Sequence, residues 1–354
     1  MPINLLPMRA ALAATLLIGA GTAARSAHAT PPSFGPTGRD LLFSPYKYVP
    51  RNFDAATNTL QVAATGKPIP LAGRGSLVED HVPNLVTVTL AFATGDCGNE
   101  DWGVPTAAIT KVAIPALSKD FVDYVISTGG QGKKFTCASP KAFADFVRRY
   151  QSPFLQGIDF DIESTQTPAE IKALVADAAH AEKLFPDVRF SFTIATWAGS
   201  DASHAGLNPL GATVVKAIKA STLRHYTINL MVMDYGKTSP AVCVVAHGAC
   251  DMGASAIQAA ENLQHTWHIP ANKIELTPIA GVNDNPDEVF TLKDLDTMMK
   301  YAVAHNLAGI HFWSLDRDTP CPAAHGKTAD PPICNGTDDP PLAFTRRALQ
   351  NLGR

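Results

Sequence analysis

The sequence predicts an α/β fold, a (β/α)8 TIM barrel in which eight parallel strands alternate with helices. Apolar segments rich in β-branched residues alternate with segments of helical periodicity along most of the chain. Strands that alternate with helices build a parallel sheet, and a barrel of roughly 250 residues with insertions fits this length. Each cysteine also falls just after a predicted strand, at the face where such barrels keep their sites.

The predicted strands are short and mostly apolar. The second is nearly continuous in Val, Leu and Thr, which is typical of a strand covered on both faces. The fifth alternates cleanly between apolar and polar residues. We expect the strands at residues 43–49, 85–92, 121–127, 155–163, 188–196, 226–234, 274–280 and 309–314.

Several predicted helices have recognisable starts. Residues 167–170 form a capping box with proline at the first helical position. Ser139 and Asn208 each precede a proline in the same way, and Thr291 is a further cap. We expect the helices at residues 107–117, 140–150, 168–185, 209–220, 254–268, 292–305 and 343–352.

The first 29 residues are interpreted as a secretory signal peptide. A basic residue, Arg9, precedes an apolar run, which ends at an A-x-A cleavage site over residues 27–29. Residues 30–354 are expected to form a single domain, secreted to the extracellular space or the periplasm. The net charge of -3 offers no basic field for nucleic acid or an anionic membrane, so we expect neither as a partner. We also expect a monomer.

Six cysteines in an exported chain indicate disulfides rather than metal ligands, and there is no C-x-x-C pair. Many pairings of six thiols are conceivable. Local spacing favours Cys243 with Cys250 and Cys321 with Cys334, which leaves Cys97 for Cys137. The bridges are expected to brace the loops beside the site.

The fourth predicted strand carries the strongest candidate site. Side chains of a strand alternate between its two faces. One face is apolar, with Ile158, Phe160 and Ile162. The other face carries Asp159, Asp161 and Glu163. Like charges on one face repel, and buried carboxylates are costly unless they are paired or protonated, so the pattern indicates a functional site rather than a solvated edge.

This strand resembles the D-x-x-D-x-D-x-E signature of glycoside hydrolase family 18, although its first Asp is Gln156 here. Residues 127–130 resemble the S-x-G-G motif of that family, and residues 231–235 resemble its M-x-Y-D region. Trp313 matches the tryptophan that ends its eighth strand. All of these segments occur in the family's order, and residues 281–284 and 312–318 look most like bacterial chitinases.

The resemblance implies a substrate-assisted retaining mechanism without metal or cofactor. Glu163 would protonate the glycosidic oxygen and later act as base, while the substrate's acetamido oxygen attacks the anomeric carbon. Asp161 would hold the acetamido N–H, and Asp159 would share a proton with Asp161. Trp313 would stack on the sugar, and we expect burial against this ring to raise the pKa of Glu163.

The other candidate residues lie around these acids. Ser127 and Gly130, in the turn beneath the site, are candidate substrate-binding residues. Met233 stands where many family members have a tyrosine that holds the acetamido carbonyl. Tyr235 is the expected substitute if the strand continues that far, and Asp234 would keep the family's acidic partner. Asp284 is a further candidate for contact with the reacting sugar.

The favoured function is a secreted chitinase that cleaves β-1,4 bonds in chitin or N-acetylglucosamine oligosaccharides. One alternative within the same chemistry is an endo-β-N-acetylglucosaminidase that acts on glycans. Another alternative is a catalytically weak, lectin-like chitin-binding protein. The presence of Glu163 argues against the lectin, and the replacement of tyrosine by Met233 argues slightly for it.

Overall fold

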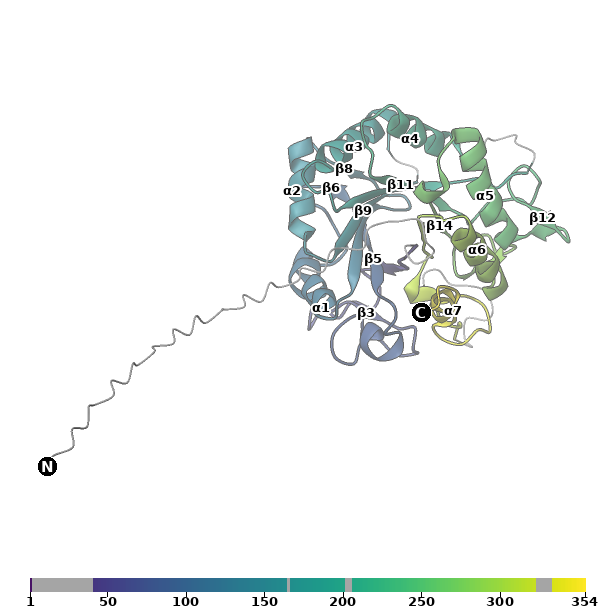
Figure 1. The fold of residues 1–354 in the computed structure, drawn as a ribbon. Helices are drawn as coiled ribbons and strands as arrows, with labels where there is room; N and C mark the ends of the chain where they lie inside the picture. The colour runs from purple at the N-terminus through teal and green to yellow at the C-terminus, as the bar shows by residue number, and fades with distance from the viewer. Residues whose placement is uncertain (2–40, 164–165, 201–205, 323–332) are drawn as a thin grey trace. The chain divides into compact units, whose positions relative to one another are not determined.

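The computed structural model describes residues 1, 41–163, 166–200, 206–322 and 333–354 (Figure 1). The described residues from 41 onward belong to one compact unit. The predicted signal peptide, apart from Met1, lies outside the described residues.

The main sheet is a closed parallel barrel. Its hydrogen-bonded order is β1-β17-β14-β11-β10-β9-β7-β5-β2. The predicted first strand changes partner at Ser44 and Pro45, so that β1 pairs with β17 and β2 pairs with β5. This change of partner closes the ring and confirms the eight-stranded barrel. The strands are β1 (Leu42–Phe43), β2 (Tyr46–Tyr48), β5 (Thr87–Ala93), β7 (Asp123–Gly129), β9 (Leu155–Ile162), β10 (Arg189–Ala195), β11 (Tyr226–Met231), β14 (Ile274–Thr277) and β17 (Gly309–Ile310).

Three strands end three or four residues earlier than predicted. The predictions reached residues 234, 280 and 314, whereas β11, β14 and β17 end at Met231, Thr277 and Ile310. The regular strands stop at these points, although Ile279 and Trp313 still form an isolated parallel bridge, and the following residues form loops at the mouth of the barrel. Asp234 adopts a positive φ of 47°, which does not belong to a strand.

Helices lie around the outside of the strands (Figure 1). The predicted caps are confirmed: Ser139, Thr167, Asn208 and Thr291 each accept a hydrogen bond from a backbone N–H of the first turn. Asp251 caps a helix that therefore starts two residues earlier than predicted. The helices and helical turns are η1 (Leu77–His81), η2 (Ala108–Ala113), α1 (Ile114–Lys119), α2 (Pro140–Tyr150), α3 (Pro168–Ala181), α4 (Pro209–Lys219), α5 (Met252–Trp267), η3 (Ala271–Lys273), α6 (Leu292–Ala304), η4 (Leu315–Arg317) and α7 (Ala343–Asn351).

The apolar face of β9 packs outward against this helical layer. The ring of Phe160 lies 5.6 Å from Phe143 of α2 and 5.0 Å from Phe192 of β10, measured between centroids. Full burial of such a side chain contributes about 1.5–3 kcal/mol. The other face of β9, which carries the acids, therefore points into the barrel.

The loops at the carboxyl ends of the strands carry the short hairpins and the disulfides. All three predicted bridges are confirmed: Cys97–Cys137, Cys243–Cys250 and Cys321–Cys334. The first bridge joins the loops after β5 and β7. The remaining short strands are β3 (Gln61–Val62), β4 (Ile69–Pro70), β6 (Gly95–Asp96), β8 (Phe135–Thr136), β12 (Val245–Ala246), β13 (Ala249–Cys250), β15 (Gly281–Val282) and β16 (Val289–Phe290). Among the helices of the described ranges, none is long and apolar enough to cross a membrane.

A fully buried ion pair ties the first strand to the loop after β17. Lys47 Nζ lies 2.6 Å from Asp316 Oδ1, and neither side chain is exposed. Lys47 also donates to the carbonyl oxygens of Tyr48 and Arg51, and Asp316 accepts from the Tyr48 N–H. The pair therefore holds η4 and the preceding Trp313 against the start of the barrel.

We predict that Lys47→Met lowers the free energy of unfolding by about 3–5 kcal/mol, because it leaves the Asp316 carboxylate buried without its counter-charge. Chemical denaturation measures this loss. The control is Lys141→Met, which breaks an exposed pair with Asp145 and should cost less than about 1 kcal/mol. Equal stability of the two variants would contradict the prediction.

Candidate active site

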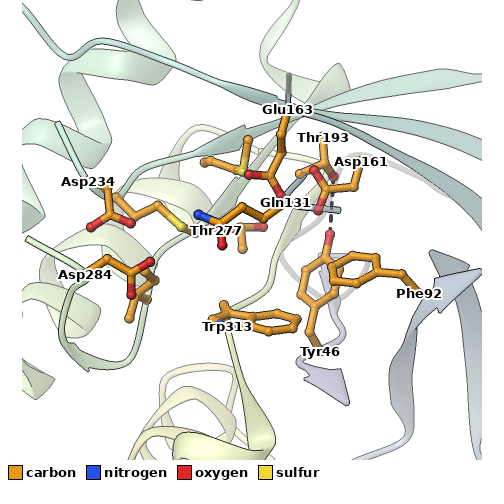
Figure 2. A pocket seen from close by; sticks show the side chains of 13 residues that line it. Tyr46, Phe92, Gln131, Asp161, Glu163, Thr193, Asp234, Thr277, Asp284 and Trp313 are labelled. Atoms are coloured by element: carbon orange, nitrogen blue, oxygen red, sulfur yellow. Dashed lines mark hydrogen bonds between the residues drawn. The ribbon is translucent and has the colours of Figure 1, made fainter. Parts of the chain in front are cut away.

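A cavity of about 120 Å³ opens at the carboxyl ends of the barrel strands (Figure 2). Six of the predicted site residues line it: Asp161, Glu163, Met233, Asp234, Asp284 and Trp313. The other lining residues were not predicted from the sequence: Tyr46, Phe92, Gln131, Thr193, Met231, Thr277 and Ile279. Five of these sit on strands β2, β5, β10, β11 and β14, where nothing in the sequence distinguishes them from other inward-facing residues.

Asp159 is the deepest of the three acids and does not line the cavity. Its side chain is buried and accepts hydrogen bonds from four hydroxyl groups. The donors are Tyr46 at 3.1 Å, Ser127 at 2.6 Å, Ser191 at 2.7 Å and Thr193 at 2.7 Å. Burial raises the pKa of Asp159, and the hydrogen bonds from the serines and Thr193 act in the opposite direction.

The same contacts correct the expectation for Ser127. It was predicted as a substrate-binding residue, but its side chain is fully buried and donates to Asp159. Ser127 therefore acts on the site through Asp159.

Asp161 lies next along the same face and borders the cavity. Its Oδ1 atom is buried and has no hydrogen-bond partner. Burial raises the pKa of Asp161 well above its usual value, and the charges of Glu163 and Asp159 add to the effect. Within the described ranges no hydrogen bond joins Asp161 to Asp159, so this structure shows no direct shared proton between them. Asp161 nevertheless lines the cavity, so its carboxyl group lies next to the space that a ligand would fill.

Glu163 follows the last residue of β9 and is half-buried at the mouth of the barrel. Desolvation raises the pKa of Glu163 to about 7, and the charges of Asp234 and Asp284 contribute further. The raised pKa was expected from burial against Trp313. Burial is indeed the main cause, whereas the second contribution comes from neighbouring acids. A carboxyl group with this pKa can serve as both acid and base near neutral pH.

Asp234 and Asp284 come from two loops that hydrogen bonds join. The N–H of Asp234 donates to Asn283 Oδ1, and the N–H of Asn285 donates to Asp234 Oδ1, at 3.3 and 3.1 Å. Glu288 accepts from the backbone N–H groups of residues 235 and 236, at 3.0 Å each. Desolvation in the cleft raises the pKa of Asp234 to about 6.

Tyr235 does not take the place expected for it. The alternation that would align it with Met231 and Met233 stops because β11 ends at Met231. The Tyr235 side chain is 4% exposed, its hydroxyl has no hydrogen-bond partner, and it does not line the cavity. The hydroxyl group that Met233 lacks is therefore not supplied by Tyr235.

Trp313 is held by other aromatic rings. Its ring stacks on Phe92 with centroids 5.5 Å apart and planes inclined by 17°. Tyr46 and Tyr48 lie at 6.1 and 5.8 Å with tilted rings. These contacts fix the orientation of Trp313, which lines the cavity opposite the acids of β9 (Figure 2).

Gly129 and Gly130 bring the loop after β7 onto β9. Both have positive φ, and the N–H of Gly130 donates to the backbone carbonyl of Asp161 at 3.1 Å. A Cβ on Gly129 would lie 2.2 Å from that carbonyl oxygen, and one on Gly130 would lie 2.8 Å from the Phe92 ring. Only glycine allows this approach. Gly130 lines a second cavity, of about 460 Å³, beside the first.

No model of a known protein family matches the chain. A probable bifunctional chitinase/lysozyme of Escherichia coli (strain K12) is 30% identical over 293 residues, which cover 72% of this chain and 31% of that protein. Endochitinase 11 of Metarhizium anisopliae is 30% identical over 269 residues, which cover 69% of this chain and 49% of that protein. The chain thus spans less than half the length of either curated relative.

The fold has solved counterparts. Catalytic-site mutants of active domain 2 of a chitinase from Pyrococcus furiosus share 22% sequence identity with this chain, with a TM-score of 0.66. The match covers 89% of this chain and 95% of that chain. This structure shows the same fold, and the two curated relatives, together with the ordered motifs and the acids on the inner face of β9, show that the chain belongs to glycoside hydrolase family 18.

Proposed function

We propose that the protein hydrolyses the β-1,4 bonds of chitin or N-acetylglucosamine oligosaccharides by substrate-assisted retaining catalysis. The observation that carries the proposal is Glu163, a half-buried carboxyl group with a pKa of about 7 beside the unpartnered Oδ1 of Asp161. The curated relatives named chitinase/lysozyme and endochitinase support the same substrate.

In the first step, the apolar face of a sugar stacks on Trp313. Glu163 donates its proton to the glycosidic oxygen as the bond from this oxygen to the anomeric carbon breaks. The acetamido oxygen of the same sugar forms a new bond to the anomeric carbon, which gives an oxazolinium ion. The leaving sugar departs with the proton from Glu163.

In the second step, water attacks the anomeric carbon. The Glu163 carboxylate accepts a proton from this water, the bond to the acetamido oxygen breaks, and the acetamido group is restored. Two inversions give net retention. Glu163 returns to its protonated form for the next cycle.

The two aspartates stabilise the oxazolinium ion. The Asp161 carboxyl group, which lines the cavity, accepts the acetamido N–H and so orients the acetamido oxygen for attack. Asp159 lies behind it and is held by four hydroxyl donors. Negative charge on these carboxyl groups attracts the positive charge that develops on the substrate.

The proposal also places the protein outside the cell or in the periplasm. Three disulfides accord with an oxidising compartment. The interpretation of residues 1–29 as a signal peptide supports the same location.

The direct test compares an N-acetylated chito-oligosaccharide with the fully deacetylated chain of equal length. Assisted catalysis predicts that only the first is cut and that the fresh product is the β-anomer, as proton NMR would show. Equal cleavage of both would contradict the mechanism. Binding without products would favour the lectin-like alternative, and preferential release of the glycan from a high-mannose glycopeptide would favour the endo-β-N-acetylglucosaminidase.

We predict that Glu163→Gln lowers kcat by about 10²- to 10⁴-fold, because the amide cannot donate the catalytic proton. Chito-oligosaccharide binding should persist, since the side chain keeps its shape. A Glu261→Gln variant on α5, outside the cavity, should keep normal turnover. Near-normal turnover of Glu163→Gln would rule out this residue as the acid.

The pH profile gives an independent prediction. Protonated Glu163 is the reactive form, so kcat/KM should fall as the pH rises above about 7. The charge of Asp284 helps to raise this pKa, so Asp284→Asn should move the alkaline limb to lower pH. Asp287→Asn, an exposed change in the same loop, should leave the limb in place. A limb in Asp284→Asn that stays or moves upward would contradict the assignment.

A further inference from the structure

Two cavities meet at the site, and four residues line both of them: Phe92, Gln131, Asp284 and Trp313. We call these four residues the neck. The smaller cavity is lined by Asp161 and Glu163, and the larger one lies beside the loops after β2, β5 and β7. A chain of sugars that occupies both cavities would therefore contact the neck.

The two aromatic members of the neck are a stacked pair, with ring centroids 5.5 Å apart. The two polar members, Gln131 and Asp284, come from the loops after β7 and β15. The side chain of Gln131 extends into the cavity in Figure 2, and Asp284 enters from a separate loop. A sugar in the neck would thus meet aromatic rings as well as two polar groups.

The loop before Gln131 is fixed in place. Gly129 and Gly130 lie directly against β9, and the N–H of Gly130 donates to the carbonyl of Asp161. Residue 131 follows at once, so its side chain starts next to the catalytic acids. An exposed loop glutamine would ordinarily be only solvated, but this one borders both cavities.

The chemistry of the Gln131 side chain suits a sugar. A primary amide both donates and accepts hydrogen bonds and is uncharged at every working pH. Sugar hydroxyl and acetamido groups present the same mixture of donors and acceptors. The Gln131 amide makes no hydrogen bond with any residue that the structure describes, so it is available to the ligand.

We propose that Gln131 is a substrate-binding residue that determines specificity for chain length. Its amide holds the sugar in the neck, and this contact makes the enzyme prefer chains that occupy both cavities over chains that fill only one. The proposal rests on the chitin-cleaving function proposed above and adds a specificity-determining contact to it.

The test is Gln131→Met, which keeps the length of the side chain and removes the amide. Steady-state kinetics would be measured on a series of N-acetylated chito-oligosaccharides from dimer to hexamer. Loss of one net hydrogen bond should lower the ratio of kcat/KM for long chains to kcat/KM for short chains by about two- to tenfold. The change should appear in KM, with kcat almost unaltered.

The matched control is Gln350→Met, at an exposed glutamine of α7 that lines neither cavity. It should leave the length preference unchanged. If Gln131→Met keeps the wild-type preference, or loses activity equally on all lengths, the inference about Gln131 is overturned and the proposed function stands. If the wild-type enzyme cleaves none of the oligosaccharides, the proposed function itself has failed.

Discussion

The structure depends on the burial of acids along the inner face of β9. On the outer face of this strand, Phe160 packs against Phe143 and Phe192. Since strand side chains alternate, that packing forces Asp159, Asp161 and Glu163 into the barrel. Buried carboxyl groups of like charge repel one another, so the rest of the site supplies hydrogen bonds or holds protons to offset this cost.

The groups that offset the cost of burial differ from one acid to the next along the strand. Asp159 has four hydroxyl donors, which come from β2, β7 and β10. Asp161 has an oxygen without any partner, and Glu163 is partly open to solvent with a pKa near 7. Three residues of similar chemistry thus acquire different properties from their depth in the barrel. This difference in depth separates Glu163, the proposed acid and base, from the two aspartates that orient the substrate.

The wall opposite the acids is stabilised by a second set of buried charges. Asp316, Arg317 and Asp318, which follow shortly after Trp313, each bind a different part of the barrel. Asp316 pairs with Lys47 of the first strand, and Arg317 donates to the carbonyl of Val282 at 2.5 Å. Asp318 accepts hydrogen bonds from backbone N–H groups at the start of α7. The aromatic wall and the Asp284 loop are therefore joined to the same framework.

The sequence alone determined the features that depend on local rules. Period-two alternation identified the acidic face of β9, capping residues identified the helix starts, and the spacing of cysteines indicated the pairs that form. Six of the ten predicted active-site residues line the cavity, because they follow strands or lie near their ends.

Only the tertiary structure decided which other residues line the cavity and which predicted residues do not. Tyr46, Gln131 and Thr193 reach the site because barrel closure brings separate strands and loops together, and Tyr235 misses it because β11 ends early. Such contacts depend on where a strand leaves the ladder and on which side chains meet across the barrel, and one-dimensional periodicity carries no information about either.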